Sequence, residues 1–235
     1  MKIHDILSAK QIDEGPNDPH IFKAVFLAGG PGSGKSYVAN RMLGGTGLKV
    51  VNSDDVFEYL AQKNNLNLGN PDDVYSDKGQ EVRNKAKDLT DKRRGDADQG
   101  EGGYIGGRLG LIIDGTGKDV SSVSTMAGKL QNLGYDTMML FVNTDLEVAQ
   151  SRNQQRDRRL PADVVTKMWQ KVQQNLMKFQ QVFGAANFHI IDNSGGMEDQ
   201  ERKANFLQVQ RAINTFLAKK PSKPAAKQWF DNNTS

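Results

Sequence analysis

Short apolar runs alternate along this chain with longer stretches in which apolar residues recur every three or four positions. The short runs predict strands at 21–28, 48–52, 109–113, 135–142 and 187–191. The longer stretches predict helices at 35–43, 55–63, 79–93, 120–133, 145–155, 162–182 and 199–217. Strands that alternate with helices are typical of a parallel sheet with helical crossovers. We therefore predict an α/β fold with a central parallel five-stranded sheet flanked by helices.

Composition divides the chain into three parts. Residues 21–217 carry the strand and helix patterns, whereas residues 1–20 are expected to form a loose lead-in. Residues 218–235 contain two prolines and four lysines against a single aspartate, which predicts a basic, flexible tail. Within the main part, residues 95–107 contain six glycines among polar residues, and we expect a mobile surface loop there.

The overall composition excludes several classes of protein. The 235 residues include no cysteine, which rules out disulfides, thiolate metal sites and a cysteine nucleophile. No apolar run approaches the length of a membrane span, and the first residues lack the apolar core of a signal peptide, so we predict a cytoplasmic protein without a membrane partner. The formal net charge of +3 equals that of the tail alone, so the body makes no general case for nucleic-acid binding.

A glycine-rich loop follows the first predicted strand. Residues 29–36 read Gly-Gly-Pro-Gly-Ser-Gly-Lys-Ser, which is the phosphate-binding loop pattern between a strand and a helix. Glycine permits the positive φ that turns backbone N–H groups toward a phosphate chain. Lys35 is then expected to reach the β- and γ-phosphates of ATP, and the Ser36 hydroxyl to bind Mg²⁺. The predicted nucleotide-binding residues are Gly29, Gly30, Pro31, Gly32, Ser33, Gly34, Lys35, Ser36 and Tyr37.

Two carboxylates follow the second predicted strand. Asp54 and Asp55 are expected at the carboxyl edge of the sheet, where open α/β folds hold ligands. A carboxylate near the γ-phosphate can accept the proton of an attacking hydroxyl or orient a metal-bound water. The same residues are also typical of a helix N-cap. Beside a phosphate loop we favour Asp54 as the base and expect both carboxylates to bind the acceptor, with Asp55 as cap or alternative base.

The third predicted strand also ends in an acid. Asp114 precedes Gly115 and Thr116 at the same edge of the sheet. Asp114 can hold Mg²⁺ through water, or it can contact the acceptor together with Thr116. A strand-end turn in which Asp and Gly are chosen for backbone reasons explains the pattern equally well.

Four arginines lie within eight residues at 152–159. Arg152 and Arg156 are one helical turn apart, so their side chains share a face. Beside a triphosphate site this pattern predicts an Arg-rich lid that closes over the phosphates and shuts out water. The alternative is a solvated basic helix end favoured by the helix dipole.

Residues 147–156, followed by Leu160-Pro161 and 164–169, resemble the lid of phage-type polynucleotide 5′-hydroxyl kinases. Residues 52–55 are similar to the Asn-x-Asp-Asp sequence after the second strand of these kinases. The resemblance implies that Asp54 activates the acceptor hydroxyl. It also implies that the two lid arginines, Arg152 and Arg156, clamp the phosphates.

The middle of the chain instead resembles the zeta-toxin kinases. Residues 113–116, then a helix, then Gly134-Tyr135-Asp136, are similar to a strand end and a following segment of that family. The resemblance implies that Asp114 helps to bind a nucleotide-sugar acceptor.

These patterns predict a P-loop NTPase fold and a kinase domain over 21–217 that transfers the γ-phosphoryl of ATP to a hydroxyl. A polynucleotide 5′ end is the first candidate acceptor, and a nucleotide sugar of the UDP-N-acetylglucosamine type is the second. An ATPase or switch without a small-molecule acceptor is a third reading. The predicted catalytic residues are Lys35, Asp54, Arg152 and Arg156, and the predicted metal ligands are Ser36 and Asp114.

Overall fold

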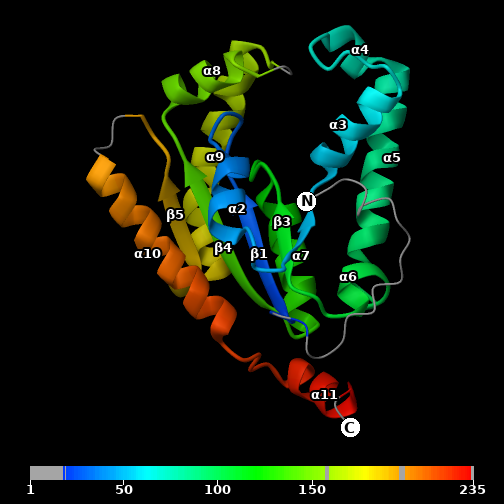
Figure 1. The fold of residues 1–235 in the computed structure, drawn as a ribbon, viewed down its shortest axis with the longest axis vertical. Helices are drawn as coiled ribbons and strands as arrows, with labels where there is room; N and C mark the ends of the chain where they lie inside the picture. The colour runs from blue at the N-terminus through cyan, green and yellow to red at the C-terminus, as the bar shows by residue number, and fades with distance from the viewer. Residues whose placement is uncertain (1–17, 19, 157–158, 196–198, 234–235) are drawn as a thin grey trace.

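The computed structural model of the chain describes residues 18, 20–156, 159–195 and 199–233. At its centre lies a parallel sheet of five strands in the order β2-β3-β1-β4-β5 (Figure 1). The strands are β1 Lys23–Ala28, β2 Lys49–Val51, β3 Leu111–Asp114, β4 Asp136–Asn143 and β5 Phe188–Asp192. All six residues of the central strand β1 are buried, as expected for a strand covered on both faces. The predicted five-stranded parallel sheet is confirmed.

Helices cover both faces of the sheet (Figure 1). They are α2 Lys35–Leu43, α3 Ser53–Lys63, α4 Pro71–Tyr75, α5 Asp77–Arg94, α6 Gly103–Gly106, α7 Val120–Asn132, α8 Leu146–Gln154, α9 Ala162–Phe183, α10 Asp199–Ala218 and α11 Pro224–Asn233. Alternation along β1 separates two cores. Val25 and Leu27 belong to the core that α2 and α10 cover, whereas Ala24 and Phe26 belong to the core that α7 and α9 cover.

A third apolar cluster lies beside the sheet and joins α3, α4 and α5 (Figure 1). Two of these helices begin with the same pattern, Asn-x-Asp-Asp. The Asn52 side chain accepts a hydrogen bond from the Asp54 N–H at 2.8 Å, and the Asn70 side chain accepts one from the Asp72 N–H at 3.1 Å. Asparagine is a favoured N-cap because its oxygen satisfies an N–H of the first turn. The repeated pattern supplies a matched pair of sites, one at the end of β2 and one away from the sheet.

The strand register brings three strand ends to one edge. Leu27 of β1 pairs with Asp114 of β3, and Val51 of β2 pairs with Ile113 of β3. The segments that follow β1, β2 and β3 therefore leave the sheet side by side. In open parallel sheets this carboxyl edge is where ligands bind.

The segment after Ala218 differs from the flexible tail predicted from composition, because residues 224–233 form helix α11. The rings of Trp229 and Phe230 lie against Phe22, with centroid distances of 5.4 and 5.8 Å. Ala226 of the same helix is fully buried. The prediction for 218–235 was wrong here because the lysines dominate its composition while three apolar side chains on one helix decide its structure.

The glycine-rich segment 95–107 also has more order than expected. It contains the short helix α6 and a bridge between Asp96 and Glu101, and Tyr104 and Ile105 are buried. The Arg108 side chain donates to the Gly100 carbonyl at 2.6 Å, which ties the segment to its end. Of the predicted lead-in 1–20, only residues 18 and 20 lie in the described part. No helix in the described residues is long and apolar enough to span a membrane.

Packing of α11 on the start of β1 is expected to contribute measurably to stability. Trp229→Ala removes a partly buried ring that meets Phe22 edge to face. We expect the free energy of unfolding to fall by about 2–3 kcal/mol, somewhat less than for a fully buried aromatic. Chemical denaturation measures this loss.

The control for this variant is Tyr75→Ala, which truncates an aromatic side chain that is 61% exposed. We expect that change to stay within about 0.5 kcal/mol of the unaltered chain. Equal effects of the two substitutions would mean that α11 does not stabilise the fold.

Candidate functional site

The glycine-rich loop lies between β1 and α2, in the predicted place. Gly34 is the N-cap of α2 and has φ 87°, a left-handed conformation that glycine adopts without strain. None of the described side chains caps this helix, and its first turn carries no acidic residue. Its first N–H groups therefore face the loop without a side-chain acceptor, which suits an anion at this helix end. Ser36 and Tyr37 follow in the first turn, and both are exposed.

Two neighbouring segments approach the loop so closely that a side chain at Gly32 or Gly34 would clash with them. A Cβ at Gly32 would lie 2.2 Å from the Ala149 carbonyl oxygen of α8, and one at Gly34 would lie 2.3 Å from the Asn193 side chain after β5. Asn193 donates to the Ser33 carbonyl at 2.8 Å. The glycines are thus required for packing as well as for backbone conformation.

Arg152 of α8 packs against the same loop. Its guanidinium lies 3.4 Å from the carbonyl oxygens of Gly32 and Ser33, and 3.1 Å from that of Asn193. Arg152 was predicted from the sequence as a site residue, whereas Asn193 was not. The signal for Asn193 was its place at the end of a fifth parallel strand, at the same edge as the other candidate residues.

Lys35 lies at the centre of the predicted charged residues. Its ammonium donates to the Gly29 carbonyl at 3.0 Å. Burial lowers the pKa of Lys35, the charge of Asp114 opposes this change, Arg156 lowers the pKa further, and Asp54 raises it. Only groups within Coulombic reach act in this way. The structure therefore brings Lys35, Asp54, Asp114 and Arg156 together.

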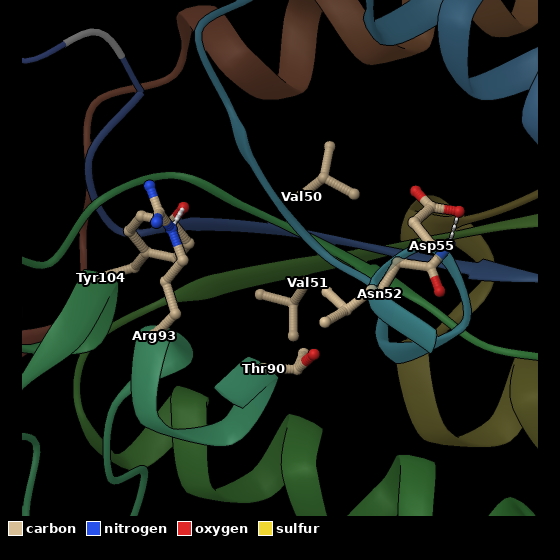
Figure 2. A pocket seen from close by; sticks show the side chains of 8 residues that line it. Val50, Val51, Asn52, Asp55, Thr90, Arg93 and Tyr104 are labelled. Carbon is tan, nitrogen blue, oxygen red and sulfur yellow. Dashed lines mark hydrogen bonds between the residues drawn. The ribbon is translucent and has the colours of Figure 1, made fainter. Parts of the chain in front are cut away.

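A single amide links the carboxylates at the strand ends. The Asn52 Nδ2 group donates to Asp55 Oδ1 at 3.1 Å and to Asp114 Oδ2 at 3.0 Å. Figure 2 shows Asn52 and Asp55 facing each other at the start of α3. Asn52 was quoted in the sequence as part of a pattern, but no role was predicted for it. Thr116, a predicted acceptor contact, meets the loop through its carbonyl oxygen, which accepts from the Gly29 N–H at 3.3 Å.

The clustered carboxylates hold their protons more tightly than isolated ones. The pKa of Asp55 is raised by burial and by the charges of Asp114 and Asp54. Burial also raises the pKa of Asp114, and Asp54 adds to this, while Lys35 opposes it. The Oδ1 atom of Asp114 is buried and accepts no hydrogen bond from any described residue. Raised carboxylate pKa values beside a partly buried lysine are typical of functional sites.

The described residues contain no group of three or more His, Cys, Asp or Glu side chains arranged to hold a metal ion by themselves. Mg²⁺ in phosphoryl-transfer sites is usually held by one or two carboxylates and the phosphates of the substrate. The orphaned Asp114 Oδ1 and the exposed Ser36 hydroxyl fit that kind of shared site.

The predicted lid lies on α8 and α9, and Asp157 and Arg158 fall outside the described residues. Asn153 is buried and closes the base of the connection between these helices, because its side chain bonds both the N–H and the carbonyl of Leu160, at 3.1 and 2.8 Å. Arg156, which follows the end of α8, is exposed.

A groove of about 830 Å³ runs from the loop between α2 and α10. Its lining includes four cationic residues and no acidic one. The lining residues are Gly34, Tyr37, Arg41, Met42, Arg152, Asn193, Arg202, Lys203, Phe206, Leu207 and Gln210. This volume is in the range of small-molecule sites.

A smaller cavity of about 20 Å³ lies between β2, α3, α5 and α6 (Figure 2). Arg93 donates from Nε to the Tyr104 hydroxyl at one end, and Asn52 and Asp55 lie at the other. The cavity has room for one or two waters but not for an acceptor molecule.

The sequence and the fold were then compared with known proteins. Residues 25–179 match the sequence model of a family described as AAA domain. A search of the curated proteins gives no match. Among solved structures, AvrRxo1-ORF1:-ORF2 with ATP has a TM-score of 0.52 and 18% identity over 74% of this chain, and this chain spans 55% of that one.

Two further structures have similar scores. AvrRxo1-ORF1:AvrRxo1-ORF2 with sulphate ions has a TM-score of 0.54 at 16% identity, covering 92% of this chain and 71% of the other. A structure from the PezAT toxin-antitoxin system of Streptococcus pneumoniae has a TM-score of 0.53 at 16% identity, covering 86% and 89%. Identities this low show the fold alone, and the predicted P-loop NTPase fold of the kinase type is confirmed.

The close contact between Gly32 and α8 allows the role of the loop in ATP binding to be tested. Gly32→Ala adds a methyl group against the Ala149 carbonyl and pushes α8 away from the loop. We expect the dissociation constant for Mg-ATP to rise about tenfold or more, which corresponds to a loss of about 1.4 kcal/mol. Titration calorimetry measures this constant.

Gly45→Ala is the matched control, because Gly45 has φ 77°, against 75° at Gly32, but a Cβ there has nothing within 4 Å. Both variants carry the same backbone strain, so only the contact differs. Equal ATP affinities in the two variants would exclude the α8 contact as the reason for glycine at 32.

The raised pKa of Asp55 yields a pH test. Burial and the neighbouring charges raise the pKa of Asp55 in the folded state, so the folded protein becomes less stable as the pH rises from the ordinary pKa of a carboxyl to this raised pKa. Asparagine cannot ionise, so Asp55→Asn is expected to unfold at a higher temperature than the unaltered chain at about pH 8, with a difference that shrinks toward about pH 4. Thermal unfolding across this range measures it.

Asp73→Asn is the matched control, since Asp73 holds the same position in the second Asn-x-Asp-Asp pattern. A pH-independent difference for Asp55→Asn would show that the neighbouring carboxylates do not act on Asp55.

Proposed function

This chain belongs to the AAA domain family, and we propose that its glycine-rich loop binds ATP. We further propose that the residues at the carboxyl edge of the sheet transfer the γ-phosphoryl of ATP to a hydroxyl. One observation carries the proposal. Lys35 at the loop lies within Coulombic reach of two carboxylates, Asp54 at the start of α3 and Asp114 at the end of β3, and of Arg156. A phosphoryl group between them would meet cations at its oxygens and a carboxylate on the acceptor side.

The proposed step needs one proton acceptor and one leaving group. The acceptor oxygen forms a bond to the γ-phosphorus, the bond from that phosphorus to the β,γ-bridging oxygen breaks, and ADP leaves. Asp54 takes the hydroxyl proton. Asp54 is favoured over Asp55 because Asp54 acts electrostatically on Lys35, the residue expected at the transferring phosphate.

Cations supply the remaining stabilisation. Lys35 and Arg156 offset the charge that spreads over the transferring oxygens. Arg152 holds the loop carbonyls and, with five N–H donors, retains capacity for a phosphate oxygen. Closure of the segment that carries Arg156 would complete the Arg-rich lid.

Ser36 and Asp114 are the residues that would hold Mg²⁺, which would supply positive charge to offset the charge of the phosphates. The base and ribose of the nucleotide would lie in the cationic groove, which begins at Gly34 and Arg152. Tyr37 is 54% exposed there and offers a ring for stacking.

The acceptor edge favours a neutral hydroxyl-bearing group. Asp54, Asp55 and Asp114 would repel a phosphate placed directly beside the attacking hydroxyl. A sugar hydroxyl meets this condition. A polynucleotide 5′ end is our first candidate, from the resemblance of the lid and of residues 52–55, and a nucleotide sugar is the second, from the strand that ends in Asp114.

The test is transfer of labelled γ-phosphate from Mg-ATP to a panel of acceptors: a 5′-hydroxyl oligonucleotide, UDP-N-acetylglucosamine and nucleoside monophosphates. We expect Asp54→Asn to lower kcat by about 10²–10⁴-fold, as for loss of a general base. Lys35→Ala is expected to lower it by about 10²-fold or more, as for loss of a group that stabilises transition-state charge.

Asp72→Asn is the control for Asp54→Asn, because it makes the same change at the same place in the second Asn-x-Asp-Asp pattern. It is expected to leave the rate unchanged. Transfer that survives in Asp54→Asn but not in Asp55→Asn would move the base to Asp55. Hydrolysis of ATP that no acceptor stimulates would replace the kinase by an ATPase or switch.

A further inference from the structure

Asn52 joins two strand ends that lie 62 residues apart in the sequence. Its carboxamide makes three hydrogen bonds, one accepted from the Asp54 N–H and one donated to each of Asp55 and Asp114. Both N–H donors of the amide are thus directed at carboxylates. The strand pairing explains why the amide reaches Asp114. Val51 of β2 pairs with Ile113 of β3, so the residues that follow them, Asn52 and Asp114, lie side by side.

Local capping accounts for two of these three bonds. At the second Asn-x-Asp-Asp pattern, Asn70 accepts from the Asp72 N–H at 3.1 Å and lies 3.4 Å from Asp73 Oδ1 as a donor. Asn52 makes the equivalent contacts to Asp54 and Asp55. The bond to Asp114 has no counterpart among the bonds of Asn70 in the described structure. A helix N-cap requires only an acceptor, so capping does not explain why Asn52 donates a hydrogen bond to Asp114.

The bond matters because the groups it joins repel each other. Asp55 and Asp114 are like-charged neighbours at a partly buried edge. The Asn52 amide donates to one oxygen of each carboxylate, which offsets part of their repulsion and fixes the position of both oxygens. The second oxygen of Asp114, Oδ1, is left buried and without a hydrogen-bond partner among the described residues.

We propose that Asn52 is a positioning residue for the transfer reaction: by holding Asp55 and Asp114 together it fixes the carboxylate face against which the acceptor hydroxyl lies. This inference rests on the proposed function. It assigns no contact between Asn52 and the reacting atoms. Losing Asn52 is therefore expected to affect the acceptor and the Mg²⁺ that Asp114 would hold, but not the binding of ATP itself.

Asn52→Ser separates positioning from capping. Serine caps a helix about as well as asparagine, but its side chain is too short to bridge two carboxylates. We expect kcat/KM for the best acceptor of the panel to fall about tenfold or more, since small misplacements of reacting groups cost up to about 10²-fold. The dissociation constant for ATP without Mg²⁺ is expected to stay within about twofold, which is a shift of less than about 0.5 kcal/mol, because Asn52 contacts no residue of the glycine-rich loop in the described structure.

Asn70→Ser is the matched control, because it makes the same change at the same kind of cap. It is expected to leave kcat/KM unchanged. A purely structural role of Asn52 would give the two variants similar shifts in unfolding temperature and no selective loss toward the acceptor. Unaltered kcat/KM in Asn52→Ser, in a chain that transfers phosphate, would overturn the proposal.

A second measurement does not depend on turnover. Asn52→Ser and Asp114→Ala are combined, and their shifts in unfolding temperature are compared with the sum of the single shifts. Non-additive shifts are expected for this pair and additive ones for Asn70→Ser with Asp114→Ala. Additivity in both pairs would contradict the bridge. An unaltered chain that transfers phosphate to no acceptor would instead defeat the proposed function, whatever the coupling shows.

Discussion

Close packing against the glycine-rich loop is the constraint on which the rest of the site depends. The Ser33 carbonyl accepts from both Asn193 and Arg152. In a trans peptide the C=O and the following N–H point in opposite directions. Holding the Ser33 carbonyl toward Arg152 and Asn193 therefore turns the Gly34 N–H away from these two residues. Two chain segments far apart in sequence thus fix the direction in which the loop presents its donors.

The same packing gives Arg152 a role that its place in a basic cluster does not suggest. Its guanidinium bonds the loop and Asn193 through backbone carbonyls. Arg156 lies beyond the end of α8 at Gln154, is exposed, and acts electrostatically on Lys35. The predicted shared helical face of the two arginines was therefore wrong, because the helix ends between them. Arg152 is held to the loop by hydrogen bonds, whereas Arg156 acts on Lys35 through its charge.

Much of this arrangement was predictable because its causes are local or periodic. The loop needs only a strand, a glycine-rich turn and Lys-Ser before a helix, all of which are contiguous. Asp54 and Asp114 were found because acids after apolar strands must meet at one edge of a parallel sheet. Asn193 and the bond from Asn52 to Asp114 were missed, since both depend on which strands are neighbours, and the chain order does not state this. Helix α11 was missed because a few buried apolar side chains outweigh the charge of the segment around them.

The two Asn-x-Asp-Asp patterns show how much of a site comes from topology. Their local structures are equivalent, with the same cap and the same reach toward the fourth residue. One pattern follows β2, whose neighbour β3 ends in Asp114, and the other follows a loop beside the sheet. Only at the first does the amide meet a third carboxylate. A four-residue sequence is therefore a helix cap in either place. The strand register adds a charged neighbour, Asp114, which together with the larger effect of burial raises the pKa of Asp55.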